Sequence, residues 1–494
     1  MTPFLVASIL VLYFAALIVI AYFTSRNATS DTFFTGNRQS PWYLVAFGMI
    51  GTSLSGVTFI SVPGAVINEG MAYFQIVLGY IIGYVVIAKI LMPIYYKMNL
   101  VSIYEYLESR FGIISYKTGA SIFILSRTLG SAMRLYLATI VLQLFLFEPL
   151  GVSYWFTAII AVLLIWIYTF KGGIKTVVFT DAFQTIFLVS AVVICVIIIS
   201  NKLNISFFNL YSEVSKMSNN GISLGKIFNF GDVNSKLYFP KQFFGGMFLA
   251  IAMTGLDQDL MQKNLTCKNL KEAQKNMYSF TSILVFVNLL FLLLGGAMYL
   301  YAQKESITLP MNAEGKIITD RVFPTLAFGE FGTLAGIFFL LGITASSYAS
   351  SDSALASLTT GFCIDFLNFK KRTDEKQKQR LKLYTHIAFS LVFLLIILLV
   401  YKLQQDALIN LILKVASYTY GPLLGLFALG IFTKKTPRDF LVPFICVLVP
   451  IICYILNENS ATWFNGYIFG FELLILNGFL TFIGLLIISK KTLK

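Results

Sequence analysis

The segment TASSYASSDSALAS, residues 344–357, places several hydroxyls and one carboxylate inside an otherwise apolar stretch. Serines at positions i, i+4, i+7 and i+11 share one face of a helix, and here they are Ser346, Ser350, Ser353 and Ser357. Hydroxyl and carbonyl oxygens are hard ligands, which suit a hard cation such as Na⁺. The segment therefore predicts either a Na⁺ site or a small-residue face that lets two helices approach closely.

Charged residues also lie inside other apolar stretches. Asp181, in FKGGIKTVVFTDAFQ, lies near the start of one, where a carboxylate costs about 2.5–3.5 kcal/mol to insert into a membrane. Arg134 lies near the middle of another, with Arg127 on the same helical face. Asp181 is therefore either part of a functional site or an acid favoured by a helix N-terminus. Arg134 requires a carboxylate, which either a ligand or the protein itself can supply.

Membrane-spanning helices must position these residues. Of the 494 residues, 57% are hydrophobic and 12% are charged, whereas soluble domains contain about 25% charged residues. We predict an all-α polytopic membrane protein, with about 13 apolar runs long enough to cross a bilayer. The predicted spans are 3–24, 42–66, 72–96, 117–147, 152–170, 179–200, 240–257, 278–302, 332–362, 383–402, 407–432, 439–457 and 466–489.

The net charge of +14 follows this topology and does not indicate a nucleic-acid partner. Lysines and arginines gather in alternate loops, including the one assigned to Lys263, Lys268 and Lys271. Cytoplasmic loops carry such an excess, so we expect the N-terminus outside and the C-terminus in the cytoplasm. The composition looks bacterial, and we expect a multi-pass protein of the bacterial inner membrane, embedded in the lipid bilayer.

The residue types that commonly bind metals or catalyse hydrolysis are scarce in this chain, which disfavours an enzyme. The chain has five cysteines without a CxxC pair, and its single histidine, His386, has no cluster of cysteines or carboxylates beside it. Disulfides, a zinc site and hydrolytic chemistry are therefore not expected.

Two of the predicted spans contain helix-breaking residues. One reads PWYLVAFGMIGTSLSGVTFISVPGAV and the other FGGMFLAIAMTGLDQDLMQ. Irregular backbone at membrane depth is tolerated where it lines a cavity or is buried in protein. Two interrupted spans in matching positions of two halves indicate the binding site of a secondary transporter. Small-residue helix packing is the alternative explanation.

Seven ordered motifs resemble the sodium/solute symporter family across almost the whole chain, most closely its sialic-acid and organic-anion-transporting members. The motifs are DTFFTGNRQSPWY, LSGVTFISVPG, SIYEYLESRFG, YTFKGGIKTVVFTDAFQ, DQDLMQKNLTCKNLKEAQK, TASSYASSDSALASLTT and YGPLLGLFALGIF. The resemblance implies a LeuT-type fold forming one domain over residues 1–494. It comprises an extra N-terminal helix (3–24), two inverted five-helix repeats (42–200 and 240–432) and two C-terminal helices (439–489).

The resemblance also implies the cation sites. The main Na⁺ would be bound by the carbonyls of Gly51, Leu54 and Ile343 and the hydroxyls of Ser346 and Ser347. Some members bind a second Na⁺, and the matching residues here are Asp181, Ser346 and Ser350. Ala349 stands where some of those members have a hydroxyl.

For the solute, the resemblance implies that Arg134 holds a substrate carboxylate and that hydroxyls of the first broken helix assist it. The matching hydroxyls are those of Ser53, Ser55 and Thr58. Asp257 and Gln258 match a polar pair that contacts or gates the solute in the family. The placement of Tyr73, Phe74 and Gln75 suggests an outer gate.

Together these observations predict a monomeric transporter that couples Na⁺ to a small organic solute by alternating access. A carboxylated solute such as sialic acid or another organic acid is the first expectation, and a neutral sugar, amino acid or vitamin is the alternative. A non-transporting receptor and a channel are functions of a different class. The receptor is disfavoured because the chain ends soon after its last span, and the channel because the sequence shows no pore-lining ring.

Overall fold

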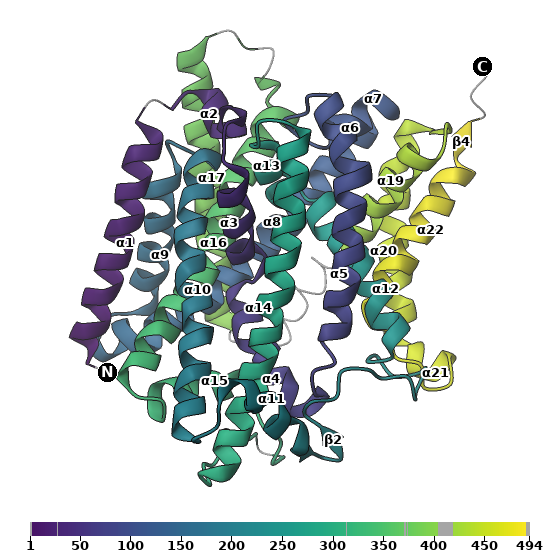
Figure 1. The fold of residues 1–494 in the computed structure, drawn as a ribbon. Coiled ribbons are helices and arrows are strands. Elements are labelled where there is room, and N and C mark those ends of the chain that lie inside the picture. Colours follow the sequence, from purple (N-terminus) through teal and green to yellow (C-terminus); the bar gives the residue numbers. More distant parts are fainter. Residues whose placement is uncertain are drawn as a thin grey trace.

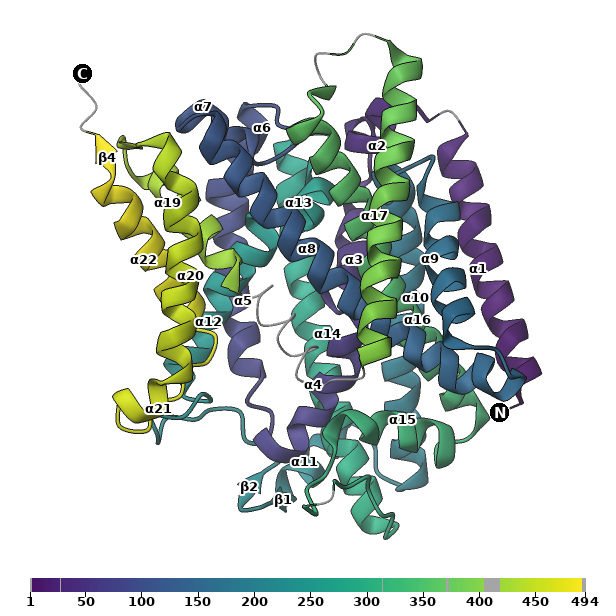
Figure 2. The same cartoon turned by 180° about the vertical axis from the view of Figure 1, so that it is seen from behind.

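The helices of the protein run roughly along one common direction and form a broad bundle (Figure 1). A computed structural model describes residues 2–26, 28–312, 314–369, 372, 374–403 and 418–490. Figure 2 shows from behind that the N-terminus and the end of the described chain lie at opposite ends of this bundle.

The first part of the chain, up to residue 223, contains eleven of the labelled α-helices and one short antiparallel strand pair. They are α1 (Pro3–Ser25), α2 (Ser30–Thr35), α3 (Trp42–Ser53), α4 (Gly56–Glu69), α5 (Phe74–Val86), α6 (Met92–Lys97), α7 (Glu105–Arg110), α8 (Ile113–Leu142), α9 (Tyr154–Thr169), α10 (Ile174–Lys202), α11 (Phe207–Lys216), β1 (Ser218–Asn219) and β2 (Ile222–Ser223).

The second part contains the remaining described helices and a second short strand pair. They are α12 (Phe239–Ala250), α13 (Gln258–Leu265), α14 (Leu270–Lys304), α15 (Thr319–Gly329), α16 (Thr333–Gly361), α17 (Glu375–Leu403), α19 (Tyr420–Phe432), β3 (Thr436–Pro437), α20 (Val442–Glu458), α21 (Ser460–Trp463), α22 (Leu473–Ile487) and β4 (Ser489–Lys490). Single π-helical turns extend four helices at Ile87–Leu91, Gln143–Phe147, Ile251–Gly255 and Phe362–Phe366.

Each predicted span overlaps a helix, although residues 407–417 of the predicted span 407–432 lie outside the described residues. Among the described residues, seven helices are long and apolar enough to cross a membrane alone, and the bent pair α3–α4 makes an eighth candidate. The helices α9, α19 and α22 are apolar but shorter. The all-α membrane architecture is confirmed, whereas the number of thirteen spans stays a prediction.

The first predicted break lies between α3 and α4, whose axes differ by 66°. Leu54 leaves helical geometry (φ −93°, ψ 76°) and Ser55 is extended. A Cβ on the next residue, Gly56, would collide with the side chain of Ser347 on α16. Glycine is therefore required here because the broken helix touches α16 directly.

The second predicted break follows the π-helical turn that ends at Gly255. Leu256 and Asp257 are non-helical, and the chain then enters the short helix α13. Two tyrosine hydroxyls donate to the carbonyls that this break exposes: Tyr95 to Gly255 and Tyr104 to Leu256, both at 2.9 Å. Both breaks exist as predicted, but the carbonyls of the second one are bonded by protein donors.

Close packing holds the first break against two long helices. On the α10 side, a Cβ at Gly48 would lie 3.0 Å from the Cβ of Asp181. The amide of Gly51 also donates to the hydroxyl of Thr185 (3.1 Å). Because α16 contacts the break at Gly56, the small residues of α3 and α4 place the break between α10 and α16.

The two longest loops between the predicted spans, residues 201–239 and 303–331, lie at one end of the bundle. Both views show α11 and α15 at the same end as α21, whereas α2, α7 and the end of the described chain lie at the other (Figure 1, Figure 2). This agrees with the predicted grouping of the loops, and the side of the membrane that each end faces stays a prediction.

Candidate functional site

Five predicted Na⁺ ligands belong to two elements that the structure brings into contact. Gly51 and Leu54 belong to the end of α3, beyond which regular helical hydrogen bonding ceases, so their carbonyls lack partners in the next helical turn. The last α3 bond runs from the amide of Leu54 to the carbonyl of Ile50. Across the contact at Gly56, α16 carries Ile343, Ser346 and Ser347.

The serine hydroxyls at this contact differ in their bonding. Ser346 donates to the carbonyl of Ile343, 3.1 Å away in its own helix. The hydroxyl oxygen of Ser347 is buried and has no hydrogen-bond partner among the described residues. A buried polar atom without a partner is costly. This oxygen therefore fits a small cation site, since all the predicted ligands are the oxygens that a hard cation prefers.

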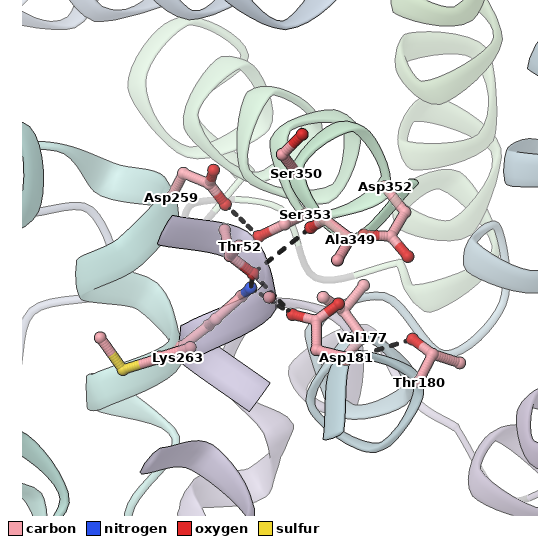
Figure 3. A network of polar contacts seen from close by, with 12 residues as sticks. Thr52, Val177, Thr180, Asp181, Asp259, Lys263, Ala349, Ser350, Asp352 and Ser353 are labelled. Atoms are coloured by element: carbon pink, nitrogen blue, oxygen red, sulfur yellow. Dashed lines mark hydrogen bonds and ion pairs between the residues drawn. The ribbon is translucent and has the colours of Figure 1, made fainter. Parts of the chain in front are cut away.

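A second polar cluster lies beside this contact, and a lysine occupies its centre (Figure 3). The ammonium of Lys263 forms an ion pair with Asp181 and a hydrogen bond with Thr52. Thr52 also donates to Asp181 (3.0 Å). Lys263 was predicted to lie in a cytoplasmic loop, and this was wrong: the residue belongs to α13 and is 1% exposed.

The serine and alanine expected at a second Na⁺ site have other partners. The hydroxyl of Ser350 donates to the carbonyl of Ser347 (3.0 Å), just as the hydroxyl of Ser346 donates to the carbonyl of Ile343. The carbonyl of Ala349 accepts a bond from Thr52 (3.3 Å). The carboxylate of Asp181 is bound by Lys263 and Thr52. Protein donors thus already bind one carboxylate oxygen of Asp181, whereas its other oxygen has no partner among the described residues.

A buried ionic cluster connects α8 with α13. Arg127 forms an ion pair with Asp259 and lies 3.7 Å from the carboxylate of Asp257. Asp257 also accepts bonds from the hydroxyl of Tyr420 (2.7 Å) and the amide of Asp259 (2.8 Å). Asp257 was predicted to contact solute, but its oxygens are bonded inside the protein.

Three other predicted solute or gate residues also have structural roles. Gln258 donates to the carbonyl of Val101 (2.8 Å) and accepts from the amide of Ile103 (2.9 Å). Gln75 is buried, and its amide group donates to the carbonyl of Leu237 (3.1 Å). Phe74 packs against the hydrophobic core. None of these three residues lines either of the two cavities beside the first break, and their solute or gate role stays a prediction.

The remaining predicted solute residues line two cavities that share part of their walls. The inner cavity, about 240 Å³, is lined by Ser53, Ser55, Thr58, Tyr73 and Arg134 among others. The larger cavity, about 660 Å³, shares Tyr73 and Arg134 with it and extends to residues of the loop that precedes α12. Both lie beside the first break, so a solute there would contact the broken helix.

Arg134 differs from the other charged residues around these cavities. Arg127 lines both cavities but is paired with aspartates, and Glu69 at the larger cavity is paired with Lys236 (2.8 Å). No carboxylate among the described residues forms an ion pair with Arg134, which is half-buried. The inner cavity therefore offers a guanidinium that is available to an anion.

Sequence reasoning missed the partners of the buried acids. Asp259 accepts a hydrogen bond from Ser353 of α16, and Asp352 accepts one from the hydroxyl of Tyr168 (2.8 Å). The signal that was available for Lys263 was Asp181, because a carboxylate buried in a membrane protein requires a cation nearby.

Comparisons with known proteins give a consistent family assignment. Residues 33–439 match the profile described as the Sodium:solute symporter family. The sodium/sialic acid symporter NanT of Aliivibrio fischeri is 24% identical, and the match covers 95% of this chain and 91% of that protein. The sodium/sialic acid symporter SiaT of Proteus mirabilis is 24% identical over 93% and 90% of the two chains.

A solved structure of a Na⁺-coupled sialic acid symporter, in its substrate-bound outward-open state, has the same fold. The TM-score is 0.80 at 21% identity, and the match covers 98% of each chain. The LeuT-type fold predicted from the motifs is thereby confirmed. The protein is a transporter and not an enzyme, and its coupling ion is Na⁺. The chain belongs to the sodium:solute symporter family, whose members move an organic solute together with Na⁺ across a membrane.

Proposed function

We propose that this symporter takes up a small carboxylated solute, with the carboxylate bound by Arg134 and the Na⁺ bound between the first break and α16. The observation that carries the proposal is the guanidinium of Arg134, which has no ion-pair partner among the described residues and lines the inner cavity. A guanidinium binds a carboxylate through two parallel hydrogen bonds. The solute then supplies the partner that the protein does not.

The charges around the inner cavity favour an anion over a neutral solute. The cluster of Arg127, Arg134, Asp257 and Asp259 has equal numbers of positive and negative groups. Its two aspartates are bonded to Arg127, Tyr420 and Ser353, whereas both guanidinium groups line the cavity. A solute therefore meets positive charge on the wall, with hydroxyls of the break as further hydrogen-bond donors.

The Na⁺ in this proposal is a transported substrate. Its ligands are the carbonyls of Gly51, Leu54 and Ile343 and the hydroxyls of Ser346 and Ser347, all of them neutral oxygens. A site of neutral oxygens suits a monovalent cation that must be released again, because several carboxylates would bind a cation more tightly. The unpartnered hydroxyl of Ser347 supports this location.

Coupling follows from the position of the break. Its residues Gly51 and Leu54 would bind Na⁺, while Ser53 and Ser55 between and beside them line the solute cavity. Sodium binding therefore orders the same short segment that completes the solute site, and the coupling must be reciprocal. Alternating access then releases both substrates on the other side of the membrane.

The names of the relatives suggest a first solute to test. Two of them are described as sodium/sialic acid symporters, and sialic acid carries the carboxylate that Arg134 would bind. The inner cavity of about 240 Å³ is small for such a solute, which would extend into the larger cavity beyond it. A smaller organic acid would fit within the inner cavity alone.

We further propose that the protein is a monomer in the bacterial inner membrane, with its N-terminus outside and its C-terminus in the cytoplasm. The charge bias of the loops supports this orientation. In that orientation the larger cavity opens to the outside, because it reaches Lys236 and Leu237 of the loop before α12.

The test is tracer uptake by purified protein in proteoliposomes. Each candidate solute is supplied with an inward gradient of Na⁺ or of Li⁺. The candidates are sialic acid, pantothenate, lactate, proline and glucose. We expect Na⁺-dependent uptake of a carboxylated solute that lacks a cationic group. Uptake of glucose alone would contradict the carboxylate assignment, and flux without dependence on an ion gradient would indicate a channel.

The Na⁺ ligands are tested with Ser347→Ala and a matched control. The control is Ser357→Ala, which removes a buried hydroxyl from the same helix where it donates to the carbonyl of Ala354 (3.0 Å). We expect the first variant to lower Na⁺ affinity at least about tenfold, which corresponds to about 1.4 kcal/mol. The control should keep wild-type Na⁺ affinity, and an unchanged affinity in Ser347→Ala would refute the assignment.

A further inference from the structure

The most deeply buried lysine of the described chain, Lys263, has no role in the proposed transport site. It is 1% exposed, and it bonds to Asp181 of α10 and Thr52 of α3. Figure 3 shows the ammonium between these two residues, facing the segment of α16 that carries Ala349 and Ser350. A buried cation is tolerated only when such partners fix it. The ammonium is therefore a fixed positive charge beside α16.

This ammonium lies among the residues expected to bind a second Na⁺. Asp181 is the only carboxylate in that set. Its Oδ2 accepts bonds from Lys263 and Thr52, whereas its Oδ1 has no hydrogen-bond partner among the described residues. Ala349 contributes no hydroxyl, and the hydroxyl of Ser350 gives its proton to a carbonyl of its own helix, as that of Ser346 does. A second Na⁺ would have to share this carboxylate with an ammonium at close range, and like charges at that distance repel.

The carboxylate of Asp352 is also buried nearby, but its contacts do not change the conclusion drawn for Asp181. Asp352 accepts a hydrogen bond from Tyr168 of α9 (2.8 Å), and its second oxygen has no partner among the described residues. Neighbouring Ser351 donates to the carbonyl of Ser347 (2.8 Å), and Ser353 donates to Asp259. Both serines thus give their protons to other protein groups, and neither hydroxyl donates to Asp352.

We propose that the ammonium of Lys263 is the resident cation of this second position, so that the protein transports one Na⁺ with each solute. The inference rests on the proposed function, because it concerns the stoichiometry of that symport. One Na⁺ and one monocarboxylate carry no net charge, so the transport step is electroneutral. With two Na⁺ ions, one positive charge would enter in each cycle.

The first experiment counts the Na⁺ ions bound to the purified full chain, with ²²Na⁺ as the probe and no solute present. The wild type should bind one Na⁺ per chain. The double variant Lys263→Met/Ala349→Ser removes the ammonium and adds a hydroxyl, and it should bind two. Lys263→Arg keeps a cation and should bind one. The triple variant, with Asp181→Asn added, should return to one.

These outcomes separate the inference from the proposed function. Two ions bound to the wild type would overturn the inference while leaving Na⁺-coupled transport intact. A double variant that is monodisperse and binds only one ion would also overturn it. A wild type that binds no Na⁺ and shows no Na⁺-dependent uptake would instead overturn the proposed function. The wild-type count alone decides the matter if the double variant does not fold.

The second experiment uses the membrane potential and needs no variant. Proteoliposomes are clamped with valinomycin and K⁺ gradients, and Na⁺-driven uptake of the monocarboxylate found in the tracer panel is measured at zero and at negative internal potential. Accumulation at steady state should be the same at both potentials. An accumulation that rises about tenfold per 60 mV would show a net positive charge per cycle, and would overturn the one-to-one stoichiometry.

Discussion

Arg127 and Arg134 are the same residue type, lie two turns apart on α8 and line the same inner cavity, yet their surroundings differ. Arg127 is 4% exposed and paired with Asp259 and Asp257. Arg134 is half-buried and has no ion-pair partner among the described residues. The two arginines therefore differ because the segment at the start of α13 supplies acids to Arg127 and not to Arg134.

The two breaks show the same division between structural and functional groups. The carbonyls of the second break accept hydrogen bonds from Tyr95 and Tyr104. The first break instead faces α16, where the hydroxyl of Ser347 has no partner among the described residues. In both comparisons the proposed binding site lies where polar groups lack protein partners among the described residues, and the partnered equivalent holds the fold together.

The largest expected effect is the loss of stability on replacing Arg127. Arg127→Met leaves Asp257 and Asp259 buried without their ion-pair partner. Breaking a buried pair in this way costs about 3–5 kcal/mol. Thermal unfolding in detergent, followed by intrinsic fluorescence, should show a much lower Tm and poor expression. A Tm within a degree of wild type would show that Arg127 is not structural and would remove the contrast with Arg134.

Arg134→Met is the matched change two turns away, and it should affect transport instead of folding. Its Tm should stay near the wild-type value, because no ion pair among the described residues is broken. Losing the charged partner of a bound carboxylate costs about 2–5 kcal/mol in binding. Uptake of the carboxylated solute should therefore fall by about a hundredfold at low concentration, whereas full retention would favour a neutral substrate.

We expect an intermediate effect for the two acids, Asp259 and Asp257, that pair with Arg127 and not with Arg134. Asp259→Asn removes the ion pair with Arg127 but keeps a group that can accept the hydroxyl of Ser353. We expect a loss of about 1–3 kcal/mol in stability. Asp257→Asn is the comparison, and its effect should be smaller because Arg127 lies 3.7 Å from that carboxylate. The reverse order in chemical denaturation would show that Asp257 is the main partner of Arg127.

The sequence predicted the features that depend on local pattern. Glycines and serines located both breaks, and the spacing of serines located the hydroxyl face of α16 that meets Gly56. Apolar length located runs that each overlap a helix of the described chain. Each of these signals lies within one segment of the sequence, so it can be found from that segment alone.

Other assignments failed because they depend on which distant residues meet. Lys263 follows the second break and belongs to the eight-residue helix α13, QDLMQKNL, whose polarity resembles that of a loop. Only the fold brings it to Asp181 on another helix. Gln258 was assigned to the solute or a gate because it matches a polar pair of the family, and Gln75 was assigned to the gate from its placement in the chain. Irregular backbone near a break also needs hydrogen-bond partners, and these glutamines supply them.

The smallest effect is expected for Arg134→Lys, which tests whether Arg134 binds the carboxylate at two points. Arg134→Lys keeps the positive charge but replaces the planar fork with a single ammonium, which cannot form two parallel bonds to a carboxylate. Losing one such bond should raise the KM for the carboxylated solute roughly tenfold, about 1.4 kcal/mol, with the Tm unchanged. The informative comparison is with Arg134→Met, because charge alone and charge with geometry are then measured separately. A lysine variant as inactive as the methionine variant would mean that the fork geometry accounts for all of the binding. A lysine variant equal to wild type would mean that Arg134 acts only as a point charge, as a lysine could, and does not hold the carboxylate at two points.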